Sequence, residues 1–135
     1  MTAGFNPMRW KCASDGCFNE KRRPKIEVFA DCFPRRINFG DVDGLVEING
    51  AFCLLEWKGD GGSVRQGQHR SYIEFTKGNA NIVFVVNGDA ETMATRDVCF
   101  YWNGRRSLPK PASLDNVKAL IRRWVMRTSS SSEVA

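Results

Sequence analysis

The chain has 135 residues, 42% of them hydrophobic, with nine Phe and four Trp, so it is long enough to bury the core of a single domain. It contains no apolar run of about eighteen residues and no apolar secretory stretch near its start, which argues against a membrane or secreted protein. Twenty Lys and Arg against fifteen Asp and Glu give a net charge of +5, so we expect a soluble, cytoplasmic protein with an anionic partner.

Residues 1–23 are interpreted as an N-terminal extension that carries two cysteines in CxxxxC spacing. Together with a third cysteine they could contribute thiolates to a structural Zn²⁺ site; these are Cys12, Cys17 and Cys32. Tetrahedral zinc needs a fourth ligand, and the only histidine, His69, belongs to another predicted element. The zinc hypothesis is therefore incomplete, and an odd count of five cysteines also argues against a disulfide framework.

The segment from Pro24 to Phe33 favours a helix, although its β-branched residues would also suit a strand. A proline suits the first turn of a helix, and Ile26 and Phe29 recur at helical spacing. Glu27 and Asp31 lie four residues apart, which places both acids on one face of such a helix.

Residues 40–60 are typical of a β-hairpin, because Asn49-Gly50 is a strong signal for a two-residue turn between apolar strands. If these two residues are central in the turn, Ile48 faces Ala51 and the numbers of every later pair sum to 99. Side chains alternate between the two faces of a sheet, so one face of the hairpin is predicted to be core. That face carries Val42, Val46, Ile48, Ala51, Cys53, Leu55 and Trp57.

The opposite face of the hairpin carries the polar residues. The same register places Asp43 opposite Glu56, and Asp41 opposite Lys58. Like charges directly opposed on a sheet repel unless something lies between them, and Mg²⁺ is a hard cation that prefers carboxylate oxygens. Apolar neighbours on this face suggest that a helix covers it, where unpaired carboxylates would be unfavourable. We therefore expect a cation between the two acids rather than a solvated face.

A helix is predicted over residues 63–77, after a glycine-rich loop and before Gly78. Gln68 and Tyr72 are four residues apart, so both project from one face of this helix. Tyr72 could instead be a packing residue only, with Gln68 exposed.

The rest of the chain contains two strands and a helix. Residues 81–86 form a near-continuous apolar run, typical of a strand buried on both faces and returning parallel to the strand of Glu56. Residues 98–102 predict another strand, and residues 109–111 a linker. The last helix begins after Ser113 and runs to Arg127, with residues 128–135 as a disordered tail.

Asp43 followed by Glu56-Trp57-Lys58 resembles the D...ExK motif of the PD-(D/E)XK nuclease superfamily, and Gln68 with Tyr72 is similar to the Q-x-x-x-Y motif of its RecB and lambda-exonuclease branch. The resemblance implies an α/β restriction-endonuclease-like fold, with an αβββαβ core over residues 24–127, a mixed central sheet flanked by helices, and here an extra C-terminal helix. It also implies a Mg²⁺- or Mn²⁺-dependent deoxyribonuclease. The catalytic residues would be Asp43, Glu56, Lys58, Gln68 and Tyr72, and the metal ligands Asp43, Glu56, the carbonyl of Trp57 and Glu27.

Clustered basic residues predict DNA as the partner, because they would neutralise backbone phosphates. The candidate DNA-binding residues are Arg35, Arg36, Arg65, His69, Arg70, Arg105 and Arg106. Two alternatives are kept: a resolvase that acts on branched DNA as a homodimer, and a phage-like regulator or anti-defence module that binds DNA or protein without cleavage.

Overall fold

The computed structural model describes residues 24, 26–35, 42–59 and 62–134, without the side chains of residues 27 and 130–134. The chain divides into two units, Met1–Asp41 and Val42–Ala135, and each is described by itself. In the first unit, the helix predicted from residue 24 is present as a 3₁₀ helix, η2 (Ile26–Cys32). The predicted N-terminal extension lies outside the described residues.

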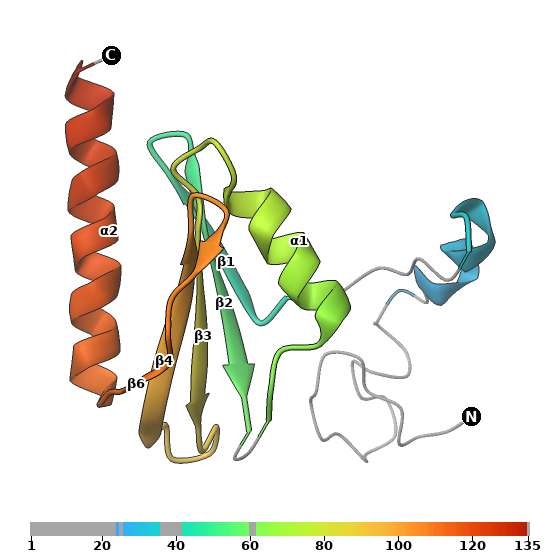
Figure 1. Cartoon of the computed structure of the whole chain (residues 1–135), viewed down its shortest axis with the longest axis horizontal. Helices are drawn as coiled ribbons and strands as arrows, with labels where there is room; N and C mark the ends of the chain where they lie inside the picture. Colours follow the sequence, from blue (N-terminus) through green and yellow to red (C-terminus); the bar gives the residue numbers. More distant parts are fainter. Residues whose placement is uncertain (1–23, 25, 36–41, 60–61, 135) are drawn as a thin grey trace. The chain divides into compact units, whose positions relative to one another are not determined.

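The second unit is a mixed β-sheet between two helices (Figure 1). Its elements are β1 (Gly44–Ile48), β2 (Ala51–Lys58), α1 (Gln66–Thr76), β3 (Ile82–Gly88), β4 (Thr95–Trp102), β5 (Arg105–Arg106), β6 (Lys110–Pro111) and α2 (Leu114–Val134). The strand order is β1-β2-β3-β4-β5, and β6 also pairs with β4. β2 and β3 are parallel, connected by α1, whereas the β1–β2, β3–β4, β4–β5 and β4–β6 pairs are antiparallel.

The β1–β2 hairpin has the predicted register. Ile48 pairs with Ala51, and the ladder continues to Gly44 opposite Leu55, so each pair sums to 99. Asn49 and Gly50 have φ values of 54° and 82°, the left-handed conformation that the central residues of this turn require. The ladder ends one residue before Asp43, and Asp41 lies outside the described residues.

The two faces of the sheet carry separate hydrophobic clusters. One cluster, beneath α2, contains Cys53, Phe84 and Val98 together with Trp124, whose indole N–H donates to the carbonyl of Ala80 at 2.8 Å. The other lies beneath α1 and contains the residues Leu54, Tyr72, Val83, Val85, Cys99 and Tyr101. β3 is buried on both faces from Ile82 to Val86, as its apolar run predicts.

Several boundaries differ from the sequence-based predictions; β4, for example, begins at Thr95 rather than at residue 98. The predicted linker at residues 109–111 contains β6, where Lys110 pairs with Val98. Helix α1 begins at Gln66 rather than at residue 63. The predicted disordered tail is wrong for residues 128–134, which continue α2; Thr128 is 3% exposed, and the side chain of Ser129 accepts a hydrogen bond from Asn49 of the hairpin turn.

The described residues show two strands before α1 rather than the three of the expected αβββαβ core. The fold class is nevertheless α/β, with a mixed sheet, an internal helix on one face and a C-terminal helix. No helix in the described part of the chain is long and apolar enough to cross a bilayer.

Candidate active site

Two charged residues of β2 lie in the interior beneath α1. Glu56 is 1% exposed and Lys58 is 4% exposed, and their side chains form an ion pair with 3.1 Å between Nζ and Oε2. They are two residues apart on one strand, so both side chains project from the same face. Removing two charges from water is costly unless each finds partners, so further polar contacts are expected around them.

Helix α1 supplies those partners from one face. The side chain of Gln68 accepts a hydrogen bond from Lys58 Nζ at 2.9 Å and donates to Glu56 Oε2 at 3.4 Å. The hydroxyl of Tyr72 donates to Glu56 Oε1 at 3.3 Å. Gln68 Oε1 also accepts from the backbone N–H of Arg65 at 3.2 Å, which fixes the glutamine at the start of the helix. The structure therefore brings together Glu56, Lys58, Gln68 and Tyr72, and the alternative of an exposed Gln68 is wrong because this side chain is half-buried and bonded to the ion pair.

The charge of Asp43 also acts on the Tyr72 hydroxyl. Burial raises the pKa of Tyr72 above its ordinary value, and the charge of Glu56, the hydrogen bond to Glu56 and the charge of Asp43 raise this pKa further. Both carboxylates thus act electrostatically on one buried phenol. This supports the expectation that Asp43 and Glu56 share the α1 side of the sheet.

Where the backbone ladder between β1 and β2 ends, the side chain of Asp43 accepts the next hydrogen bond from β2. Its Oδ2 accepts a hydrogen bond from the backbone N–H of Trp57 at 2.6 Å, a short, charge-assisted contact. The N–H and C=O of one strand residue point to the same edge of the strand. The carbonyl of Trp57 is therefore directed to the edge of β2 on which Asp43 lies. Asp43 is exposed, and in the described part of the chain its Oδ1 has no hydrogen bond.

The donor set fits a hard divalent cation. Two carboxylates and one carbonyl are the oxygen ligands that Mg²⁺ and Mn²⁺ use, with water and substrate completing the coordination. No cluster of three or more His, Cys, Asp or Glu side chains suited to a metal occurs among the described residues. The predicted ligand Glu27 has its side chain outside that set, as do the zinc candidates Cys12 and Cys17, and Cys32 is exposed in the first unit.

His69, a candidate DNA-binding residue, contacts a buried tyrosine. It is half-buried, and its Nδ1 lies 2.7 Å from the hydroxyl of Tyr101, a β4 residue with 0% exposure. The Tyr101 ring in turn packs edge-on against Tyr72, with 5.2 Å between the ring centroids. Burial raises the pKa of Tyr101. His69 therefore supports the site through two tyrosines.

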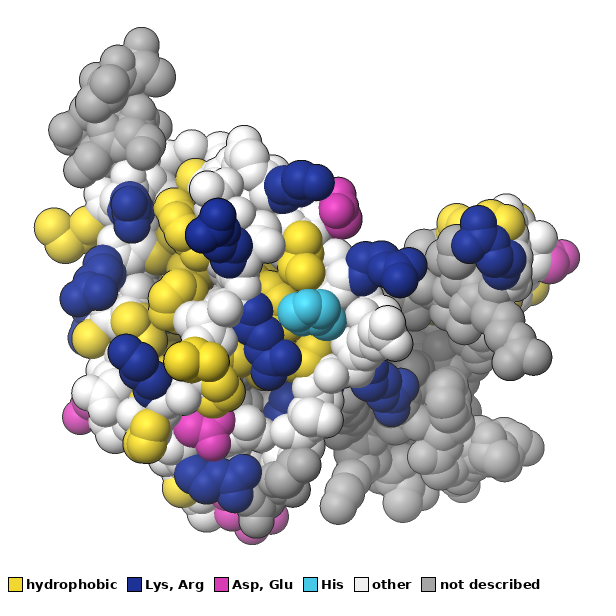
Figure 2. Space-filling model, in the orientation of Figure 1, with side chains coloured by type: hydrophobic (Ala, Val, Ile, Leu, Met, Phe, Trp, Pro, Cys, Tyr) yellow, Lys and Arg dark blue, Asp and Glu magenta, His cyan; other side chains and the backbone are white. Residues whose placement is uncertain are grey.

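Most of the candidate DNA-binding arginines are on the surface. In the second unit, Arg65, Arg70, Arg105 and Arg106 are exposed. In the first unit, Arg35 is exposed and Arg36 lies outside the described residues. Figure 2 shows Lys and Arg side chains spread among hydrophobic ones over one face of the second unit. Such a surface suits a polyanion.

The hydrogen-bonded pair of Asn87 and Asp97 lies near the site and was not predicted from the sequence. Asn87 pairs with Lys58 across the parallel β2–β3 ladder, so both side chains lie on the α1 face. Its Nδ2 donates to Asp97 Oδ1 at 2.9 Å, and its own Oδ1 is buried without a hydrogen bond to any described group. The available signal was a polar residue at the end of an otherwise apolar strand.

Fold and site together define an α/β protein with a buried carboxylate–ammonium pair between a parallel strand pair and its connecting helix. Comparison with protein-family models, with curated proteins and with solved structures gives no match. The function is therefore inferred from the residues of the site.

Proposed function

We propose that this chain is a divalent-metal-dependent deoxyribonuclease of the restriction-endonuclease-like class, which hydrolyses a phosphodiester bond by attack of water. The observation that carries the proposal is the set of contacts around Glu56. Lys58 and Gln68 meet one of its carboxylate oxygens and Tyr72 the other, while Asp43 accepts from the backbone N–H of Trp57, the residue between Glu56 and Lys58. These are the residues of the D...ExK and Q-x-x-x-Y pattern.

The carboxylates of Asp43 and Glu56 and the carbonyl of Trp57 would hold Mg²⁺ or Mn²⁺. Such an ion lowers the pKa of a bound water and stabilises the charge that develops on the phosphate. Asp43 is accessible from solvent, whereas Glu56 is buried. The exposed acid thus lies on the side from which a cation and a phosphate would enter.

Lys58 is suited to orient the attacking water and to stabilise negative charge on a phosphate oxygen. Its ammonium group is held by Glu56 and Gln68, so its position is defined before substrate binds. Ordered catalytic groups lose less entropy during the reaction. Gln68 and Tyr72 accordingly act as positioning residues for Lys58 and Glu56.

The exposed arginines Arg65, Arg70, Arg105 and Arg106 would bind the DNA backbone. Two of them belong to α1 or its N-cap, the helix that also carries Gln68 and Tyr72. Phosphate contacts of this kind fix the register of DNA but do not read its sequence.

The test is cleavage of supercoiled, linear, single-stranded and four-way-junction DNA by purified protein, with Mg²⁺ or Mn²⁺ and with EDTA. Asp43→Asn is the informative variant, because an exposed side chain can be replaced with little effect on folding. Lys58→Ala is a second variant, and circular dichroism verifies that each is folded. Metal-dependent cleavage that Asp43→Asn loses supports the proposal.

The same substrates separate the two alternatives. Cleavage confined to four-way junctions would indicate a resolvase. DNA binding with no cleavage under either metal would contradict the nuclease and indicate a binding module.

A further inference from the structure

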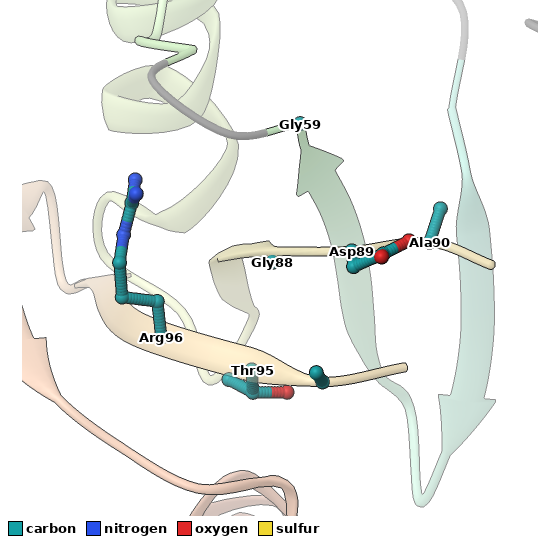
Figure 3. A pocket seen from close by; sticks show the side chains of 7 residues that line it. Gly59, Gly88, Asp89, Ala90, Thr95 and Arg96 are labelled. Atoms are coloured by element: carbon teal, nitrogen blue, oxygen red, sulfur yellow. The ribbon is translucent and has the colours of Figure 1, made fainter. Parts of the chain in front are cut away.

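A cavity of about 440 Å³ opens at the end of the sheet where β2 and β3 finish. Small ligands typically occupy cavities of about 300–1,000 Å³, so one ligand of that size fits. Gly59, at the end of β2, lies on one side of it, and Gly88, Asp89 and Thr95 lie around the rest (Figure 3).

The cavity adjoins the proposed active site along the chain. Gly59 directly follows Lys58, and consecutive Cα atoms are about 3.8 Å apart, so one wall begins one residue beyond the lysine. Gly88 directly follows Asn87, the neighbour of Lys58 on β3. β2 and β3 are parallel and run into α1 and a turn, and ligands of open α/β sheets bind outside the carboxyl ends of such strands.

Four of the residues that line the cavity have little or no side chain: Gly59, Gly88, Ala90 and Ala94. No residue other than glycine fits at position 88, because a Cβ atom there would clash with the carbonyl oxygen of Ala94. A flat ring that enters the cavity therefore meets few bulky side chains.

The wall formed by the turn between β3 and β4 is held by its own hydrogen bonds. The N–H of Asp89 donates to the carbonyl of Ala94 at 2.8 Å, and the N–H of Met93 donates to the carbonyl of Asp89 at 2.7 Å. The Asp89 side chain accepts from the N–H of Glu91 at 2.9 Å. These bonds give the cavity a defined shape.

Besides Asp89, two further polar side chains line the cavity. Thr95 provides a hydroxyl group, and the side chain of Arg96 extends along one side of the cavity (Figure 3). Arg96 is 53% exposed and forms an ion pair with Asp97, with 3.4 Å between Nε and Oδ2. A guanidinium group that is about half exposed can reach a phosphate, and its planar fork of donors suits phosphate oxygens.

From this geometry we infer that the cavity binds one unpaired nucleotide next to the phosphate that is cut. The inference rests on the proposed function and names the class of substrate: DNA that is single-stranded or frayed at the cleavage site. A paired base cannot enter, because its two faces are stacked and its edge is bonded to the opposite strand, whereas an unpaired base can leave the stack at low cost. The base would lie among the small lining residues, and Arg96 would contact its phosphate.

The experiment compares three end-labelled DNAs of one sequence: an intact duplex, the same duplex with a short mismatched segment, and the single strand. Ala90→Trp fills the cavity, and Ala119→Trp is the matched control, since Ala119 is exposed on α2. Wild type should cut the single strand and the mismatched duplex about tenfold or more faster, in kcat/KM, than the intact duplex. Ala90→Trp should lose about tenfold on the unpaired substrates, and Ala119→Trp should stay within about twofold of wild type.

Binding of a short fluorescent single strand in EDTA, followed by anisotropy, provides a measurement that is independent of cleavage. Ala90→Trp should weaken this binding about tenfold relative to Ala119→Trp. Equal cleavage of paired and unpaired DNA, or wild-type binding by Ala90→Trp, would overturn the nucleotide site and leave the nuclease intact. If wild type and Ala119→Trp bind the single strand more tightly than Ala90→Trp does, but none of the three proteins cleaves DNA, the result would support the nucleotide site and contradict the nuclease.

Discussion

Replacing one partner of the Glu56–Lys58 pair should lower the free energy of unfolding far more than replacing both partners together. The two side chains are 2% and 5% exposed and their charged atoms are 3.1 Å apart, so each charge depends on the other. Lys58→Met leaves the Glu56 carboxylate buried without its ammonium partner, although the hydrogen bonds from Gln68 and Tyr72 remain. Removing one partner of a buried pair typically costs about 3–5 kcal/mol of unfolding free energy.

For a unit of this size, about 1 kcal/mol corresponds to about 4–8 °C in Tm, so Lys58→Met should lower Tm by about 12 °C or more. The double variant Glu56→Gln/Lys58→Met removes both charges and keeps similar shapes. It should recover to within about 1 kcal/mol of wild type, because a buried pair and neutral residues of similar volume differ little in stability.

The assay is urea unfolding followed by circular dichroism, arranged as a double-mutant cycle of wild type, the two single variants and the double variant. We expect a coupling energy of about 2 kcal/mol or more. If Lys58→Met does not fold at all, a folded double variant supports the same conclusion. A single variant that loses less than about 1 kcal/mol, or a double variant that loses the sum of both singles, would refute the reasoning.

Further predictions concern the neighbours of this pair. Asp43→Asn should change the unfolding free energy by less than about 1 kcal/mol, because Asp43 is exposed, while reducing cleavage by about a hundredfold or more; unfolding and cleavage measured on one preparation separate the two effects. Because the folded-state pKa values of Tyr72 and Tyr101 are raised, the folded protein retains their protons above pH 10, so the contribution of these two tyrosines to the unfolding free energy should be constant below about pH 10 and fall above it. Tyr72→Phe should flatten that fall in urea titrations between about pH 9 and 11, and an equally steep fall in the variant would contradict the assignment. Burial raises the pKa of Cys53 to about 11, so iodoacetamide at about pH 8 should modify Cys53 only after unfolding, as peptide mass spectrometry would show; rapid modification of the native protein would contradict its burial.

The parts of the fold that sequence reasoning predicts correctly are those set by local chemistry. Asn49-Gly50 fixes the turn, and the turn fixes the register of the hairpin, because only residues tolerant of positive φ suit its two central positions. The four-residue spacing of Gln68 and Tyr72 places both on the face of α1 that meets the sheet.

The parts that were missed depend on contacts distant in sequence. The pairing of Lys110 with Val98 involves a strand of two residues, too short to give an alternating pattern. The bond between His69 and Tyr101 joins residues 32 apart, and no local pattern specifies such a partner. The end of α2 was predicted as disordered from its run of serines, but burial of Thr128 is part of the environment that keeps it helical.

Cleavage of linear and single-stranded DNA by wild type and Asp43→Asn, assayed side by side in Mn²⁺ and in EDTA, tests the central proposal most directly. We predict that wild type cuts in Mn²⁺ and not in EDTA, and that the folded Asp43→Asn variant does not cut in either. Cleavage by Asp43→Asn at the wild-type rate, or by wild type in EDTA, would contradict a metal-dependent site built on Asp43 and Glu56.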